Sequence, residues 1–140
     1  MLMKRLFLLL AVLVSAVCLS PAQTEFRKLS HDKGLEVAKA EGKLLFVDFY
    51  ATWCGWCKRM DRDLFPQKNV GDFMNKQFVC IKLDAEKAEE GAPYMEKYGV
   101  KGFPTYVILD PKTGKVVYTL PGAVLDGNEF IQKMKTAIGK

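Results

Sequence analysis

Two cysteines separated by two residues, Cys54 and Cys57, follow an apolar run of strand length. Residues 44–50 are aliphatic or aromatic except for Asp48, which is typical of a buried strand, and residues 58–64 can form a helix. The cysteines therefore fall where a strand is followed by a helix. Both sulfur atoms then lie on one side of the first helical turn, where unpaired N–H groups and the helix dipole stabilise a thiolate. This spacing predicts a redox-active dithiol.

A zinc site and a purely structural disulfide are the alternative uses of this pair. A structural zinc ion usually has four Cys or His ligands, and the remaining candidates are Cys80 and His31. We therefore expect neither a metal nor another cofactor. A bridge across two residues closes too short a loop to stabilise the fold much. Redox exchange is the favoured interpretation, and we expect His31 to be a solvated residue near a helix cap.

The first 22 residues have the layout of a secretory signal peptide, with a basic start, an apolar segment over residues 6–17 and small or turn-forming residues before position 23. The apolar segment is shorter than the roughly 20 residues of a membrane span. We expect cleavage after Ala22. Cleavage after Cys18 and a retained signal anchor are alternatives. Lipidation at Cys18 is less favoured because bulky Val17 precedes it.

Export would place residues 23–140 in an oxidising compartment, where disulfides are available as substrates. The C-terminal residues are not an ER-retention signal, which favours a bacterial periplasm. The length after cleavage fits one domain. Loss of two basic residues with the signal peptide lowers the formal charge of +5 by two, and no cluster of Lys or Arg forms a binding stripe. We expect a monomer that binds no nucleic acid.

Segments with strand-like and helix-like patterns alternate along the rest of the chain. The expected order is a helix that begins after Ser30 or Asp32 and ends at Gly42, a strand over 44–50, helical segments over 58–64 and 70–76, a strand over 77–84, an interrupted helix over 85–98, strands over 105–109 and 115–120, and a helix capped at 126. Early alternation predicts a parallel crossover, and the late hairpin predicts an antiparallel edge. The fold class is therefore α/β, with a mixed sheet covered by helices on both faces.

These motifs together resemble the thioredoxin family, and the resemblance covers the chain from about Glu25 onward. Residues 47–58 are similar to the family's active-site strand and helix, and residues 102–105, Gly-Phe-Pro-Thr, to its second hallmark. The residues that flank the cysteines are most similar to exported thioredoxin-like proteins, including the C-terminal domain of the reductase DsbD. The resemblance implies a thioredoxin-like three-layer fold over residues 23–140 and catalysis of thiol:disulfide exchange.

The resemblance also implies the roles of the residues at the dithiol. Cys54 would attack a substrate disulfide, and Cys57, expected to be less exposed, would resolve the mixed disulfide. Buried Asp48 would accept the proton of Cys57. Thioredoxin has a lysine near this aspartate, four residues before the position of Asp84, and Cys80 stands there in this chain. We therefore expect no cation beside Asp48. Cys80 is expected to be a buried inert thiol, with a regulatory disulfide as the alternative.

A peptide-binding surface around the dithiol is implied in the same way. Pro104 matches the family's cis-proline, Phe103 would offer its backbone to a substrate peptide, and Gly122 matches a glycine that lets substrate backbone approach. Gly55 and Trp56 separate the cysteines, and Trp56 stands where thioredoxin has proline. The reduction potential of thioredoxin therefore cannot be transferred to this chain.

Two tryptophans complete this surface, Trp53 mainly by packing and Trp56 as part of an exposed rim.

The expected function is reduction of disulfides in protein substrates in the cell envelope, with electrons from a membrane thiol reductase. The alternatives are a disulfide oxidase or isomerase, and a non-catalytic peptide-binding module with the same fold.

Overall fold

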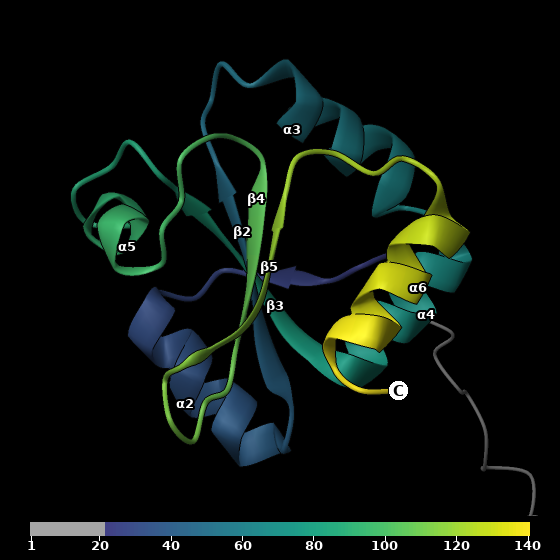
Figure 1. Ribbon diagram of the computed structural model, residues 1–140, viewed down its shortest axis with the longest axis horizontal. Coiled ribbons are helices and arrows are strands. Elements are labelled where there is room, and N and C mark those ends of the chain that lie inside the picture. The colour runs from purple at the N-terminus through teal and green to yellow at the C-terminus, as the bar shows by residue number, and fades with distance from the viewer. Residues whose placement is uncertain (1–21) are drawn as a thin grey trace, which may run out of the picture.

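The computed structural model describes residues 22–140, which form a central β-sheet with helices on both faces (Figure 1). Within those residues the sheet has five strands in the order β1-β3-β2-β4-β5. The strands are β1 (Phe26–Arg27), β2 (Leu44–Tyr50), β3 (Phe78–Asp84), β4 (Thr105–Leu109) and β5 (Val116–Pro121). The helices are α2 (His31–Glu41), α3 (Gly55–Arg59), the π-helix η2 (Met60–Leu64), α4 (Lys68–Gln77), α5 (Ala92–Lys97) and α6 (Gly127–Ala137). The expected signal peptide, apart from Ala22, lies outside the described residues, and so does Cys18.

Strand β2 lies in the middle of the sheet, parallel to β3 and antiparallel to β4. Strands β4 and β5 form the expected hairpin, and β1 adds a short parallel edge to β3. The crossover from β2 to β3 runs through α3, η2 and α4. The predicted α/β class with a mixed, helix-covered sheet is confirmed. The carboxyl end of β2 leads directly to the two cysteines.

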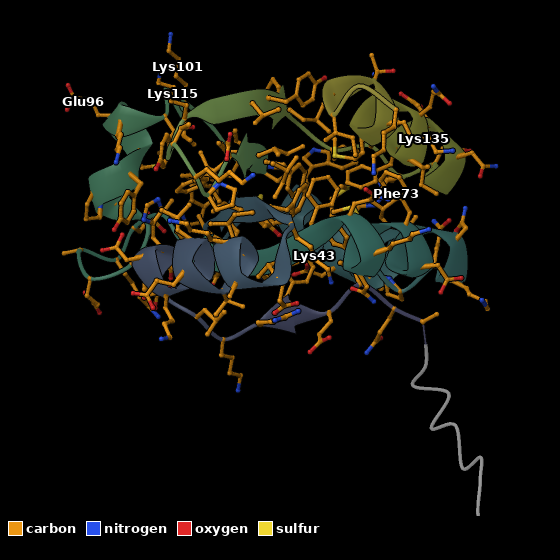
Figure 2. All side chains as sticks on the ribbon, turned by 90° about the horizontal axis from the view of Figure 1, so that it is seen from below. Lys43, Phe73, Glu96, Lys101, Lys115 and Lys135 are labelled. Atoms are coloured by element: carbon orange, nitrogen blue, oxygen red, sulfur yellow. A yellow bond between two sulfur atoms is a disulfide. The ribbon has the colours of Figure 1, made fainter. Side chains whose placement is uncertain are left out.

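Side chains of β2 alternate between two hydrophobic clusters, one on each face of the sheet. Phe46 packs with Tyr106 on the face that η2, α4 and α6 cover. Leu45 and Val47 pack on the other face, against α2 and the residues around α5. Figure 1 shows α4 and α6 together on one side of the sheet and α2 on the other, and Figure 2 shows side chains filling the space between the layers. By this alternation Asp48 shares a face with Phe46.

Residues with capping side chains set the ends of the longer helices. Helix α2 begins after Ser30, whose hydroxyl oxygen accepts a hydrogen bond from the N–H of Lys33, and it ends at Gly42 in the left-handed conformation, with φ of 67°. Helix α6 begins after Asp126, whose carboxylate accepts from the N–H of Glu129 over 2.8 Å. These helix ends agree with the sequence prediction.

The helix that follows the cysteines changes its hydrogen-bond spacing part-way along. Helix α3 ends at Arg59, and η2 continues to Leu64 with π-type turns. The N–H of Phe65 donates to the carbonyl oxygen of Met60, five residues earlier. Met60 and Leu64 are fully buried on the same face of the sheet as Phe46. The change of spacing is compatible with keeping both side chains in the core.

The segment over residues 85–98 is helical only over α5, so the prediction of a helix on both sides of Pro93 is wrong for the first half. The carbonyl oxygen of Asp84 accepts a hydrogen bond from the N–H of Gly91, and the Asp84 carboxylate accepts one from the N–H of Glu86. These bonds hold the chain in turns that compete with a helix. Pro93 then lies in the first turn of α5, where its missing N–H is tolerated.

His31 is buried, so the prediction that it is a solvated residue is wrong. Its Nε2 atom lies 2.7 Å from Oη of Tyr98, its Nδ1 atom lies 2.7 Å from a carboxylate oxygen of Asp32, and its ring stacks on Tyr94. Burial lowers the pKa of His31 below its ordinary value, although Asp32 opposes that shift. Tyr98 is 67 residues further along the chain, so local sequence around His31 does not reveal this contact.

Candidate active site

Cys54 and Cys57 are joined by a disulfide at the beginning of α3, with their Cα atoms 5.3 Å apart. Cys54 is the N-cap residue of this helix, and its Sγ atom accepts a hydrogen bond from the N–H of Cys57 over 3.1 Å. A donor directed at Sγ stabilises negative charge on that atom once the disulfide is reduced. The geometry therefore favours Cys54 as a thiolate.

The two sulfur-bearing residues are equally accessible, since each is 4% exposed. The expected lower exposure of Cys57 is thus wrong for the disulfide form. Ala51 is buried in the same small cluster, and Tyr50 and Phe103 pack against it. What distinguishes the cysteines is therefore the hydrogen bond at Cys54, and not their exposed fraction.

Two exposed tryptophan side chains flank the disulfide. Trp53 is 67% exposed, so the prediction that it mainly packs is wrong, although its ring meets that of Phe103 edge to face at 5.9 Å. Trp56 is 53% exposed, as expected for a rim, and the guanidinium of Arg59 lies 4.9 Å from its ring centroid. Both tryptophan rings therefore lie at the surface beside the disulfide.

The segment before β4 lies beside this aromatic surface. The peptide bond between Phe103 and Pro104 is cis, and the carbonyl oxygen of Pro104 accepts a hydrogen bond from the N–H of Gly122 over 2.8 Å. These three residues line an open surface pocket of about 460 Å³ together with Lys101, whose side chain projects from the surface (Figure 2). Gly122 has a φ of 86°, which strongly favours glycine. Residues far apart in sequence are thus brought together.

Gly55, the residue after the first cysteine, has open space around it. A Cβ atom there would meet no atom within 4 Å other than its own chain neighbours and helix backbone. No steric contact therefore requires glycine at this position of the fold.

Asp48 is buried on β2, on the face that η2 covers. Burial raises its pKa to about 6, even though the Nζ atom of Lys82 lies 3.3 Å from its Oδ2 atom and opposes the shift. Its Oδ1 atom has no hydrogen-bond partner among residues 22–140. A carboxyl group with this pKa can both accept and release a proton near neutral pH.

The prediction that Asp48 lacks a nearby cation is wrong. Lys82 lies directly opposite Asp48 across the parallel pair β2 and β3, two residues beyond Cys80. The cation therefore comes from Lys82, two residues further along β3 than the position at which thioredoxin has its lysine. A charged residue inside the otherwise apolar run of β3 is the signal in the sequence that could have identified it.

Cys80 is buried and forms no disulfide within the part of the chain that the structure describes. Burial raises the pKa of its thiol far above the ordinary value. A neutral buried thiol is a poor nucleophile. The prediction of an inert core cysteine agrees with these observations.

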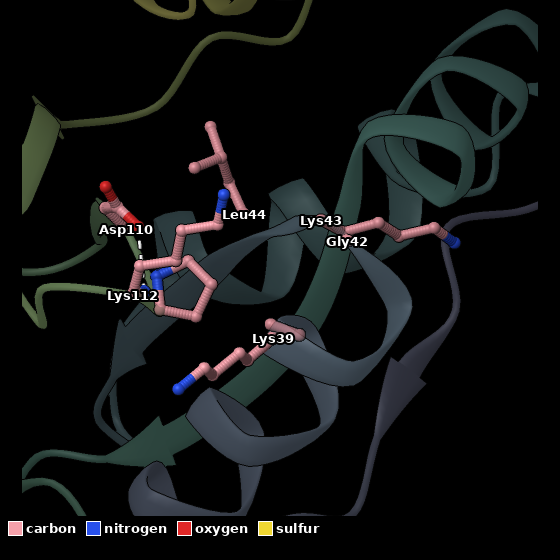
Figure 3. Close-up of a pocket in the computed structure, with 8 residues that line it drawn as sticks. Lys39, Gly42, Lys43, Leu44, Asp110 and Lys112 are labelled. Atoms are coloured by element: carbon pink, nitrogen blue, oxygen red, sulfur yellow. Dashed lines mark hydrogen bonds between the residues drawn. The ribbon is translucent and has the colours of Figure 1, made fainter.

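A second pocket, of about 260 Å³, lies at the opposite end of β2 from the cysteines (Figure 3). Leu44, at the beginning of β2, and Asp110, after the end of β4, are among its lining residues. Asp110 accepts a hydrogen bond from the N–H of Lys112, and Lys43 points away to donate to the carbonyl oxygen of Asn75. This pocket has no part in the redox site.

Over residues 22–140, no group of three or more His, Cys, Asp or Glu side chains is placed to bind a metal ion. In the same range, no helix has both the length and the apolar character needed to cross a membrane.

The protein-family model described as a thioredoxin-like domain matches residues 31–138 of the chain. The chain belongs to the thioredoxin-like family. A proposed disulphide-isomerase from Bacteroides thetaiotaomicron is 42% identical to this thioredoxin-like protein, with a TM-score of 0.73 over 83% of this chain and 93% of that one. The oxidised C-terminal domain of DsbD from Neisseria meningitidis is 25% identical, with a TM-score of 0.62 over 75% of this chain and 90% of that domain.

The protein disulfide isomerase-like 5-3 of Oryza sativa subsp. japonica is 39% identical over 82 residues, which make up 59% of this chain and 19% of that protein. The chain thus spans about a fifth of the length of this relative. The predicted family resemblance is confirmed, and proteins named thioredoxin and protein disulfide isomerase are among the relatives of this chain.

Proposed function

We propose that this protein is exported to the cell envelope, where residues 1–22 are removed as a signal peptide and residues 23–140 reduce disulfides of other proteins. The order of basic, apolar and small residues at the start of the chain supports export. The likeness to the C-terminal domain of DsbD supports a periplasmic role. A protein that stays attached to the membrane through a lipid or through the uncleaved signal peptide is the less favoured alternative.

The chemistry centres on the hydrogen bond from the Cys57 N–H to Sγ of Cys54. In the dithiol form, the Cys54 thiolate attacks one sulfur of a substrate disulfide, which forms a mixed disulfide and releases the other substrate sulfur as a thiolate. Cys57 then loses its proton to Asp48 and attacks Sγ of Cys54. The second substrate sulfur leaves with the electron pair of the broken bond, so the substrate is reduced and the protein returns to its disulfide form.

The substrate would lie across the surface between the tryptophans and the cis peptide bond. The backbone of Phe103 before Pro104 would pair with an extended substrate segment, and Gly122 would leave room for its backbone. Trp53 and Trp56 would cover the apolar side chains next to the substrate cysteine, and Gly55 would keep the approach to the sulfur atoms open.

A reductant outside the cytosol needs a supply of electrons, because that compartment lacks the cytosolic thiol pool. We propose a membrane thiol reductase as the donor, which would reduce the Cys54–Cys57 disulfide by the reverse of the same exchange. The protein would act as a monomer, without a cofactor and without nucleic acid as a partner.

The test is the equilibrium reduction potential of the Cys54–Cys57 pair in dithiothreitol buffers, measured on protein that begins at Gln23. A value near ~−270 mV supports a reductant, and a value near ~−120 mV would overturn that direction and favour an oxidase. Isomerase activity on scrambled ribonuclease with no activity as a reductant would favour the isomerase. Wild-type protein that exchanges no disulfide at all would favour the peptide-binding module.

A further inference from the structure

Three charged side chains form a row that begins at the buried carboxyl group of the site. Asp48 on β2 faces Lys82 on β3, with 3.3 Å between Oδ2 and Nζ. On its other side, the same Nζ atom donates a hydrogen bond to a carboxylate oxygen of Asp61. Asp61 lies on η2, four residues after Cys57. One ammonium group is therefore shared by two carboxylates.

The row runs from the core to the surface. Asp48 is buried, the Lys82 side chain is partly exposed, and the Asp61 side chain is about half exposed. Asp61 and Lys82 line a surface pocket of about 340 Å³ with Phe26 among its walls. The Nζ atom of Lys82 also lies 5.1 Å from the ring centroid of Phe26, so the ammonium is held on several sides.

We propose that Asp61 is a positioning residue for proton transfer at Asp48. By binding Lys82, Asp61 prevents the ammonium from pairing fully with the buried carboxylate, so that Asp48 remains able to take up a proton. This inference deepens the proposed function and rests on it for the role of Asp48. The proton that Asp48 accepts from Cys57 would leave through the pocket that Lys82 and Asp61 line.

The other titratable groups that face Asp48 stay neutral near pH 7. Tyr106 lies opposite Asp48 on β4, and Cys80 lies on β3 on the same face. Burial raises the pKa of both groups well above their ordinary values, so both keep their protons. Among the described residues, Lys82 and Asp61 are therefore the charged groups that control protonation of Asp48.

Removing the Asp61 charge should lower the pKa of Asp48 for two reasons. The negative charge of Asp61 favours the protonated form of Asp48, so its loss lowers the pKa of Asp48. Lys82 is also released from Asp61 and can approach the remaining carboxylate, which lowers that pKa again. Asp61→Asn should therefore make Asp48 a stronger acid and a weaker base.

The decisive measurement is an NMR titration of the side-chain carboxyl carbon of Asp48 in the disulfide form of the full-length mature protein. We expect the midpoint in Asp61→Asn to lie at lower pH than in the wild type. Asp63→Asn is the matched control, because Asp63 is on the same turn and pairs with Arg62 instead of Lys82. Its midpoint should equal that of the wild type.

A second measurement concerns catalysis. The pH profile for reduction of a disulfide-bonded peptide under single-turnover conditions should shift to lower pH in Asp61→Asn, and its plateau should fall about two- to fivefold, because a weaker base accepts the Cys57 proton less readily. An Asp48 midpoint that is unchanged in Asp61→Asn, or shifted equally in Asp63→Asn, would overturn the proposal. The titration uses no substrate, so it remains decisive even if the proposed reductant activity fails.

Discussion

The backbone N–H of Cys57 lies 3.1 Å from the Sγ atom of Cys54 and donates a hydrogen bond to it. In the reduced protein this donor stabilises the Cys54 thiolate, and Cys80 stays buried and protonated. We therefore predict that iodoacetamide modifies Cys54 first, with a midpoint in the pH profile of the rate below the ~8.5 of a free thiol. Mass spectrometry of the reduced, alkylated protein identifies the modified residue.

Cys54→Ser is the control for this experiment. In that variant the remaining thiols of the mature protein, Cys57 and Cys80, should react at least about tenfold more slowly at pH 7. Faster modification of Cys57 than of Cys54 in the wild type would contradict the prediction and show that Cys57 is the more reactive thiol.

The contribution of Asp48 to the stability of the fold should fall as the pH rises. Its folded-state pKa of about 6 lies above the unfolded value of ~3.9, so the folded protein binds more protons between these values. The contribution of Asp48 is therefore most favourable below pH 4 and is lost as the pH rises through about 6. Relative to wild type, Asp48→Asn should gain up to about 3 kcal/mol of unfolding free energy between pH 4 and pH 8.

Urea denaturation of both proteins at several pH values measures this difference. The comparison uses the change with pH, because the buried amide of Asn adds an offset that does not depend on pH. Parallel stability curves for the wild type and Asp48→Asn would show that Asp48 titrates at its ordinary pKa.

Much of the fold was predictable because its signals are local. The apolar run before Cys54, the cap at Ser30 and the turn after Leu109 each specify an element through neighbouring residues. The wrong prediction for residues 85–91 has a physical reason, since hydrogen bonds to Asp84 compete with a helix over a stretch whose composition alone allows one.

Within the site, the dithiol was predictable from neighbouring residues, and the cation beside Asp48 was not, because the sheet brings it there from a distant part of the sequence. The dithiol motif identifies Cys54 and Cys57, but pairing of Lys82 with Asp48 depends on the register of β2 and β3. A shift of two residues along β3 exchanges Cys80 for Lys82, and a pattern of alternating side chains cannot distinguish positions that share a face.

The hydrogen bond between His31 and Tyr98 should contribute measurably to stability. Tyr98→Phe leaves the buried Nε2 atom of His31 without its partner, which should cost about 1–3 kcal/mol. Tyr94→Phe is the matched control, because the Tyr94 hydroxyl makes only a long contact of 3.5 Å with Asp32. Thermal and urea denaturation should show a larger loss for Tyr98→Phe than for Tyr94→Phe, and equal losses would contradict a specific role for this bond.

The exposed ring of Trp53 should matter for substrate binding and not for folding. Trp53→Ala should lower kcat/KM for insulin reduction by about fivefold, as for a side chain that contributes about 1 kcal/mol to an interface. Its unfolding free energy should stay close to that of the wild type. Val117→Ala removes another exposed apolar side chain, on β5, and should leave both quantities unchanged. Loss of stability without loss of kcat/KM in Trp53→Ala would make Trp53 a packing residue after all.

The segment before β1 is held against α4 by a close approach that only glycine allows. A Cβ atom on Gly71 would lie 2.6 Å from the carbonyl carbon of Gln23, and the side chain of Asn75 forms hydrogen bonds with the backbone on both sides of Thr24. Gly71→Ala must therefore displace the segment, and we predict faster proteolysis before Phe26 and lower stability by about 1–3 kcal/mol. Gly55→Ala, which meets no nearby atom, is the control and should not destabilise the protein. Unchanged proteolysis in Gly71→Ala would mean that the segment is not anchored at α4.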